Sequence, residues 1–390
     1  MVKEKITRTL HDSSVISLLC AQYSLPPPTR FVSLAGGFSG TNYRCDFQHQ
    51  PSICLKICHG YERIFVEAQA KVQHHLFQHQ YKMACFAMTL NATSQCSTFS
   101  FATQDPTTGD PVIVLTFVNG RAADALLEEK LVSVDVVFQG MGASLGELHT
   151  VPVCDQDQLR TYQDGGACDV YKQMMKIELK RMEISIHTKN HPFLTFYIPR
   201  RQALEDAMCK AEHLNLTRGV IHGDPFADNV MLDPTTGQVS AWVDWEDATT
   251  GPILFDVAVA IIGTCFPEGS SKLDPLRLKR LMAGYTRVRP LPKEEVELLV
   301  EFCRLALLCN CCWRFTNFHI AHREIIDCRN RYAELRDRIL ELERPDTQQS
   351  IVKIFSKNSN GHYVVAEIND KEFSWFRIVV GTIVLFSFVW

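Results

Sequence analysis

One part of the chain constrains its fold more than any other: residues 220–233, followed by residues 239–246. The first segment predicts a loop that carries Asp224 and Asn229. The second predicts the return strand of a short β-hairpin that ends at Asp244. The spacing therefore predicts that an acid, an amide and a second acid are held together at one end of a hairpin.

These three side chains suit phosphoryl transfer. One carboxylate, Asp224, orients or deprotonates a hydroxyl group, while Asn229 and Asp244 offer oxygen ligands for Mg²⁺ on the phosphates of a nucleotide. The alternative is a soluble loop with incidental acids. The regular spacing of positions 222, 224 and 229 before the hairpin disfavours that alternative.

The same residues resemble those of a known superfamily. His222-Gly-Asp-x-x-x-x-Asn229, with Val-Asp244-Trp-Glu246 after it, resembles the aminoglycoside phosphotransferase/choline kinase superfamily of protein-kinase-like small-molecule kinases. Within it, the chain looks most like the type II homoserine kinase branch. The resemblance implies ATP as phosphoryl donor, Mg²⁺ as cofactor, Asp224 as the catalytic residue, and Asn229 and Asp244 as metal ligands.

The resemblance also implies two residues that support the loop. His222 is expected to act structurally and not as a proton carrier, and Asp256 is expected to brace the loop from the start of a helix. Pro225 departs from the pattern, because proline removes a backbone N–H and restricts Asp224 toward extended conformations. Asp244 and Asp256 are only twelve positions apart. This leaves no room for a segment that positions a peptide substrate, and so favours a small acceptor.

Residues 31–46 predict a strand, a glycine turn and a second strand. Glycines let backbone N–H groups approach an anion closely, so the turn offers a phosphate-binding loop. By itself such a turn is more often a plain hairpin. The candidate nucleotide-binding residues in it are Gly37, Phe38 and Ser39.

Lys56 lies inside a predicted strand, residues 52–58, where an ammonium group is costly unless it has a partner. We expect that partner to be Glu67, on a helix predicted over residues 63–78. A strand lysine paired with a helix glutamate is the arrangement that holds the α- and β-phosphates in kinases. The alternative for each residue taken singly is a surface charge.

Two further strands are predicted over residues 97–103 and 112–118, joined by the turn Asp-Pro-Thr-Thr-Gly. In kinase-like folds the end of the second strand is the hinge that meets adenine. On the resemblance alone, Thr116 and Val118 are therefore candidate nucleotide-binding residues.

The remaining residues up to 345 predict mainly helices. His149 closes one of them and is expected to serve in packing. Glu246, Trp313 and Arg314 are candidates for binding the acceptor, because an ammonium group needs an acid and a carboxylate needs an arginine. For Trp313 and Arg314, a core aromatic and a solvated charge are equally open.

The length of 390 residues favours more than one lobe. We expect an α+β, bilobal, protein-kinase-like fold. An antiparallel-sheet lobe (1–118) would bind nucleotide, and a helical lobe (119–345) would hold the catalytic residues and the acceptor. Residues 346–390 are expected to be a linker and a hydrophobic tail.

Composition bears on partners and compartment. A net charge of −4 without a basic run disfavours a nucleic-acid partner. The 15 cysteines, with no secretory signal ahead of them, indicate reduced thiols in a cytoplasmic protein. Cys309, Cys311 and Cys312 lie in a long apolar helical run, which favours core packing over a metal site.

The tail leaves several interpretations open. Residues 378–390 contain no charge, but these 13 residues are fewer than the roughly 20 needed to span a bilayer. A membrane anchor, an added strand packed on the domain and an unselected extension of the sequence all fit.

The sequence thus predicts ATP- and Mg²⁺-dependent phosphorylation of a hydroxyl on a small metabolite, with a homoserine-like amino alcohol favoured. Choline, ethanolamine, hydroxylysine or aminoglycoside kinases are the alternatives within this chemistry. A catalytically silent nucleotide-binding scaffold is the alternative outside it.

Overall fold

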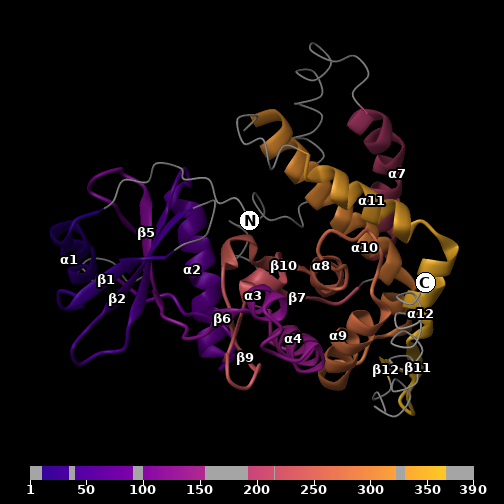
Figure 1. Ribbon diagram of the computed structural model, residues 1–390, viewed down its shortest axis with the longest axis horizontal. Helices are drawn as coiled ribbons and strands as arrows, with labels where there is room; N and C mark the ends of the chain where they lie inside the picture. Colours follow the sequence, from indigo (N-terminus) through magenta and orange to yellow (C-terminus); the bar gives the residue numbers. More distant parts are fainter. Residues whose placement is uncertain are drawn as a thin grey trace, which may run out of the picture.

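The protein has two lobes, described by a computed structural model that covers residues 11–34, 40–90, 100–153, 192–214, 216–321 and 330–365. Figure 1 shows a sheet with helices α1 and α2 on the left and a larger group of helices on the right. The predicted α+β, bilobal arrangement is confirmed.

The first lobe is a five-stranded antiparallel sheet in the order β1-β2-β3-β5-β4. The strands are β1 (Arg30–Ser33), β2 (Gly40–Asp46), β3 (Ile53–Cys58), β5 (Pro111–Thr116) and β4 (Thr103–Gln104). Only the last part of the strand predicted over residues 97–103 forms, and residues 91–99 lie outside the described part.

Alternation along β3 decides where Lys56 points. Leu55 and Ile57 pack with helix α1 (Ser13–Ala21) on one face of the sheet. Because neighbouring side chains of a strand point to opposite faces, Lys56 lies on the other face, which helix α2 (Arg63–Gln78) covers. This is also the face turned toward the second lobe (Figure 1).

The second lobe is mainly helical. Its helices are α3 (Ala123–Glu128), α4 (Val134–Leu148), α7 (Pro192–His213), α8 (Ile253–Thr264), α9 (Pro275–Val288), α10 (Lys293–Arg314), the π-helix η4 (Phe315–Ala321), α11 (Tyr332–Leu342) and α12 (Pro345–Lys353). Helix α8 is apolar and almost wholly buried, so it forms the centre of the lobe. Glycines let α4 and α9 approach closely, because a Cβ on Gly142 would collide with the carbonyl of Leu281.

Two small sheets in this lobe carry the loops predicted to be functional. Strands β6 (Arg121–Ala122), β8 (Val230–Leu232) and β9 (Val239–Trp242) form one sheet, while β7 (Arg218–Ile221) pairs with β10 (Thr249–Pro252) in the other. The loop predicted to be catalytic, residues 222–229, runs from β7 to β8 and ends in the 3₁₀ turn η2 (Ala227–Asn229); we refer to it as the catalytic loop. The loop that contains the predicted metal ligand Asp244, residues 243–248, runs from β9 to β10 and contains the 3₁₀ turn η3 (Trp245–Asp247); we refer to it as the metal loop.

The expected linker after Pro345 was wrong. Pro345 begins α12, where a missing N–H is harmless in the first helical turn. A hairpin of β11 (Phe355–Lys357) and β12 (Tyr363–Val365) follows. Tyr363 exchanges backbone hydrogen bonds with Leu291, at 3.0 and 2.7 Å, which ties the hairpin to the loop after α9. The predicted tail, residues 378–390, lies outside the described residues.

The cysteine cluster of α10 belongs to the core, as predicted. Cys309, Cys311 and Cys312 are buried among apolar side chains. In the described ranges, no group of three or more His, Cys, Asp or Glu side chains is arranged to hold a metal ion by itself. None of the described helices has the length and apolar character that crossing a membrane requires.

The packing of α12 gives a first prediction. Ile351 is fully buried, whereas its neighbour Val352 is 45% exposed. We expect Ile351→Ala to lower the free energy of unfolding by about 2–4 kcal/mol, because it removes buried methyl groups and leaves a cavity. Urea denaturation measures this change. Val352→Ala is the matched control, and equal small losses for the two variants would show that α12 is not part of the core.

Candidate active site

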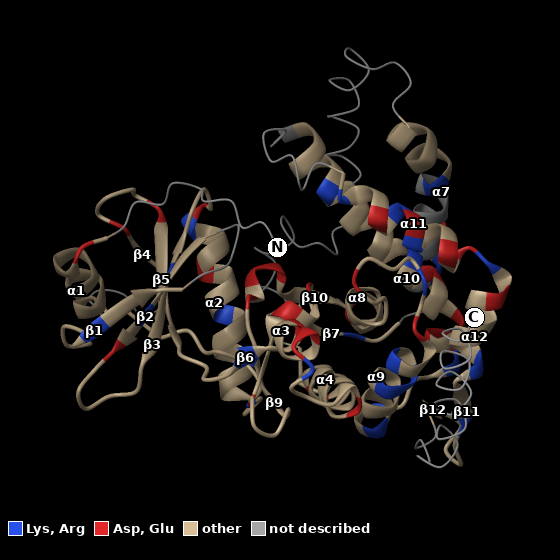
Figure 2. Ribbon diagram, in the orientation of Figure 1, with Lys and Arg blue, Asp and Glu red and all other residues tan. Residues whose placement is uncertain are grey.

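The candidate site lies where the two lobes meet. The sheet lobe contributes Lys56 from β3, and the helical lobe contributes the catalytic and metal loops. Figure 2 shows acidic segments around α3 and beside β10, on the side of the helical lobe that faces the sheet lobe. The predicted residues of both loops are therefore brought to one place.

The catalytic loop is closed by its own hydrogen bonds. The side-chain amide of Asn229 donates to the backbone carbonyl of Asp224 at 2.9 Å and to its carboxylate at 3.0 Å. The backbone N–H of Phe226 donates to the carbonyl of Asp224 at 2.8 Å. Pro225 is buried between these contacts, so the loop accommodates the residue that departed from the family pattern.

Asp256 braces the loop from the first turn of α8. Its two carboxylate oxygens accept hydrogen bonds from the backbone N–H groups of His222, at 2.7 Å, and Gly223, at 2.8 Å. Gly223 has a φ of 85° and lies against the backbone of Asp247, so no side chain fits there. This is the bracing role predicted for Asp256.

A second line of support reaches Asp256 from two other helices. His149, at the end of α4, lies 3.2 Å from Asp256 through Nε2 and 2.8 Å from the hydroxyl of Tyr285 through Nδ1. His149 is therefore structural, as expected. The part played by Tyr285 was not predicted, since nothing in the sequence indicates a contact between residues 136 positions apart.

His222 joins the catalytic loop to the metal loop. Its Nε2 lies 3.0 Å from the carbonyl of Val243, which only accepts, so Nε2 carries the proton. Its Nδ1 accepts from the backbone N–H of Asp224 at 3.3 Å. Burial lowers the pKa of His222, which keeps this neutral tautomer. The contacts agree with a structural role and leave neither nitrogen for proton transfer.

Asp244 occupies a strained backbone position at the start of the metal loop. Its φ and ψ are both 61°, in the left-handed region that aspartate tolerates better than most residues. This conformation turns the chain sharply after β9. The Asp244 carboxylate lies 2.8 Å from Nζ of Lys56.

The expected pairing of Lys56 with Glu67 was wrong. Lys56 contacts Asp244 and, at 3.2 Å, Glu246. The Glu67 carboxylate instead accepts hydrogen bonds from the backbone N–H groups of Phe101, at 3.0 Å, and Ala102, at 2.9 Å. These donors precede the short edge strand β4 and would otherwise be unsatisfied, so they hold Glu67 away from the lysine.

The site carries more negative than positive charge. Burial raises the pKa of Asp224 well above its ordinary value, and the nearby carboxylates of Asp247, Asp228, Asp244 and Glu246 raise it further. Burial works in the opposite sense on Lys56, but Asp244 and Glu246 outweigh it and hold the lysine pKa well above its ordinary value. One lysine thus faces several acids.

This charge balance fits a divalent cation. The Asn229 amide donates its N–H groups to Asp224, which leaves its oxygen as an acceptor, and the Asp244 carboxylate is close by. Amide and carboxylate oxygens are the ligands that Mg²⁺ prefers, and it usually completes its shell with phosphates and water. The two predicted metal ligands therefore have the chemistry that Mg²⁺ requires.

For the other predicted nucleotide-binding residues, the structure shows only contacts within the protein or does not describe them. Thr116 ends β5, and its hydroxyl accepts from the backbone N–H of Phe86 at 2.9 Å. Val118 packs against the main core. The glycine-turn candidates lie outside the described residues: Gly37, Phe38 and Ser39.

The acceptor candidates Trp313 and Arg314 end α10. Trp313 is 40% exposed and packs edge-on against Phe318. Arg314 lies 3.4 Å from Glu334. Burial raises the pKa of Asp228, and the charge of Arg314 only partly opposes that rise. Glu246, the third candidate, contacts Lys56.

Comparison with known proteins points in one direction. The phosphotransferase enzyme family (APH) matches residues 30–291. The homoserine kinase of Polaromonas naphthalenivorans is 34% identical over 106 residues, which cover 27% of this chain and 33% of that protein. The homoserine kinase of Neisseria meningitidis serogroup B is 41% identical over 81 residues, covering 21% and 26%. The chain matches only about a third or less of the length of these relatives.

Similar solved structures extend over most of the chain. A choline/ethanolamine kinase family protein from Mesorhizobium loti has a TM-score of 0.55 at 16% identity, covering 87% of this chain and 99% of that one. A microcompartment-associated aminopropanol kinase has a TM-score of 0.54 at 14% identity, with the same coverage. At such identities the likeness shows the fold, and it confirms the predicted protein-kinase-like architecture.

The two hydrogen bonds from the catalytic loop to Asp256 give a second prediction. We expect Asp256→Asn to speed amide hydrogen exchange at His222 and Gly223 by roughly tenfold or more. An amide replaces one acceptor oxygen with a donor, which leaves a buried N–H without its partner at a cost of about 1–3 kcal/mol.

The matched control is Asp274→Asn. Asp274 caps α9 by accepting from the backbone N–H groups of Leu276 and Arg277, so its loss destabilises a different element. Equal exchange at His222 and Gly223 in the two variants would show that Asp256 does not hold the loop.

Proposed function

The chain belongs to the phosphotransferase enzyme family, and from this premise we propose that it transfers a phosphoryl group from ATP to a hydroxyl group of a small metabolite. One observation carries the proposal. Asn229 holds the carboxylate of Asp224 in the helical lobe, and Asp244 of the same lobe pairs with the phosphate-binding candidate Lys56 of the sheet lobe. Phosphoryl transfer depends on positioning and on electrostatic stabilisation, and this set supplies both.

Each side chain has a role that follows from its surroundings. Asp224 orients the acceptor hydroxyl and accepts its proton, and it is held for this by Asn229. Lys56 binds the phosphates. Asn229 and Asp244 would hold Mg²⁺, which neutralises phosphate charge when bound. No covalent intermediate is required, because the hydroxyl attacks the phosphorus directly.

The two lobes divide the work in this proposal. The sheet lobe, up to residue 118, binds the nucleotide through Lys56, the glycine turn and the hinge residues Thr116 and Val118. The helical lobe, from residue 119, carries the catalytic and metal loops and binds the acceptor. Helix α12 and the hairpin of β11 and β12 extend this lobe at least to Val365.

We propose a homoserine-like amino alcohol as the acceptor. The curated relatives named above are homoserine kinases, and the similar structures include choline/ethanolamine and aminopropanol kinases. An ammonium group is what these acceptors share. Several carboxylates surround Asp224, and their negative charges add to burial in raising the pKa of Asp224. A cationic acceptor would reduce this repulsion, so the site favours one. Arg314, at the end of α10, is the candidate partner for a substrate carboxylate.

The silent scaffold is the alternative of a different class. In the sequence, Pro225 and the short glycine turn are its only support. The loop nevertheless keeps its internal hydrogen bonds around this proline, and all three polar residues of the motif are present. The geometry therefore favours a working kinase.

An acceptor screen tests the proposal. We expect ADP release from ATP to depend on added homoserine or a related amino alcohol, in a panel with choline, ethanolamine, hydroxylysine and an aminoglycoside. Asp224→Asn should lower the rate about 10²–10⁴-fold, the usual contribution of a positioned base, while ATP still binds.

The half-exposed Asp337 of α11 provides the matched control, and Asp337→Asn should leave the rate unchanged. Binding of ATP without acceptor-dependent ADP release across the panel would support the scaffold instead. Phosphorylation of peptides would contradict a small acceptor.

A further inference from the structure

The acids that hold Lys56 come from the lobe opposite to its own. Lys56 belongs to the central strand of the sheet lobe, and its side chain is only 8% exposed. Its Nζ lies 2.8 Å from Asp244 and 3.2 Å from Glu246, both on the metal loop of the helical lobe. The buried Lys56 thus has a second partner, Glu246, in addition to the proposed metal ligand Asp244.

Helix α2 does not provide that partner. Glu67 is the sole acid in its sequence, and it is bound to the N–H groups of Phe101 and Ala102. The electrostatic influences that most affect Lys56 come from Asp244, Glu246 and Cys58. An acid on a helix of the nucleotide lobe orders the phosphate-binding lysine in protein kinases, so this arrangement is different.

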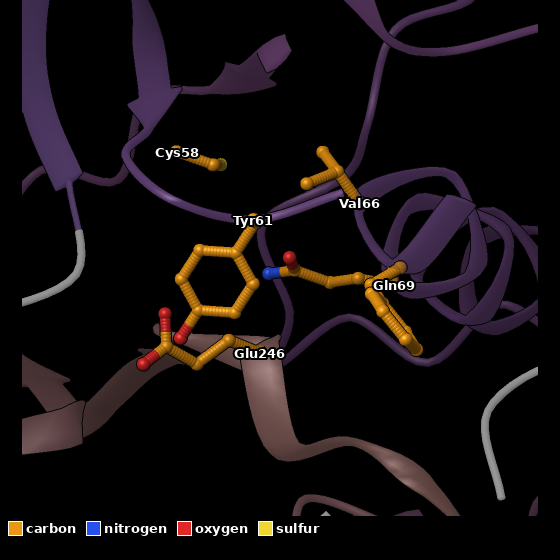
Figure 3. A pocket seen from close by; sticks show the side chains of 6 residues that line it. Cys58, Tyr61, Val66, Gln69 and Glu246 are labelled. Atoms are coloured by element: carbon orange, nitrogen blue, oxygen red, sulfur yellow. The ribbon is translucent and has the colours of Figure 1, made fainter. Parts of the chain in front are cut away.

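The α2 residue that faces Glu246 of the metal loop is Gln69, whose side chain is neutral. Gln69 is only 4% exposed and lines a small hollow, of about 210 Å³ including open solvent, together with Cys58, Tyr61, Phe65, Val66 and Glu246. Figure 3 shows Gln69 and Glu246 reaching this hollow from opposite sides, with the Tyr61 ring beside them. Glu246 is the sole acidic residue among these lining residues.

We infer that Glu246 is the residue that positions Lys56 for the nucleotide phosphates, in place of an acid on α2. Asp244 alone does not suffice for this, because its carboxylate is also the proposed metal ligand. Glu246 follows it by two residues, on the 3₁₀ turn that Asp244 precedes, and contacts the same Nζ. The metal loop then sets the position of both the cation and the lysine.

This role rests on the proposed function, since it concerns binding of ATP, and it differs from the acceptor-binding role expected from the sequence. A lysine positioned by Glu246 links the two lobes directly. Rotation of α2 would leave the lysine in place, whereas movement of the metal loop would displace it. The distinction is measurable through ATP affinity alone, without any acceptor.

A double-mutant cycle on ATP binding tests the inference. The variants are Glu246→Gln, Lys56→Met and the two combined, with ATP affinity measured by isothermal titration calorimetry on the full chain. We expect Glu246→Gln to weaken ATP binding about tenfold, as the loss of a charged hydrogen bond does. In the Lys56→Met background the same change should have less than about a twofold effect, because Glu246 acts through the lysine.

Three further variants separate charge from structure. Glu246→Asp keeps the carboxylate and should bind ATP more tightly than Glu246→Gln. Glu128→Gln, at an exposed glutamate of α3, should bind ATP as the parent does. Glu67→Gln should lower the melting temperature while weakening ATP binding less than Glu246→Gln.

If the parent protein binds ATP, either of two results would overturn the inference. One is an equal loss of ATP affinity from Glu246→Gln with and without Lys56. The other is unchanged ATP affinity with a raised KM for the acceptor, which would return Glu246 to acceptor binding. Failure of the parent protein to turn over any acceptor would count against the proposed function only, because the cycle needs ATP alone. Failure to bind ATP would overturn both.

Discussion

The buried carboxylate of Asp256 is the interaction on which the rest of the site depends. An ionised group in an apolar helix is costly unless hydrogen bonds compensate it. Asp256 meets that condition through the backbone of His222 and Gly223 and through His149. Two of these partners, His222 and Gly223, are consecutive residues of the catalytic loop. The same bonds that stabilise the carboxylate therefore also fix the direction in which the chain leaves β7 and reaches Asp224.

The support around Asp256 depends in turn on how two helices pack. His149 ends α4 and Tyr285 lies on α9, and they meet only because the two helices pack at close range. Gly142 and Gly284 face the partner backbone at this contact, where a Cβ on either would collide. Small residues far from the chemistry thus position the hydrogen bond that holds His149 against Asp256.

The sequence predicted the positions of residues that belong to a local pattern or motif. It did not predict side-chain partners that are set by tertiary contacts. Alternation in β3 predicted that Lys56 is buried, and the loop motif predicted which residues meet at the site. The partner of Lys56 was missed because unsatisfied N–H groups at Phe101 and Ala102 attract Glu67, and no pattern along α2 reveals them. Pro345 was misread because proline both follows helices and begins them.

Charge and strain in the metal loop have a common consequence. Asp244 is held in a left-handed conformation, and the acids around Asp224 repel one another, and both effects lower the stability of the site. Lys56 offsets part of this cost by pairing with Asp244 and Glu246 across the lobes. A cation would offset more, and binding to the folded state alone stabilises that state. The unfavourable electrostatics that lower the stability of the site are therefore the same ones that would favour the cation proposed above.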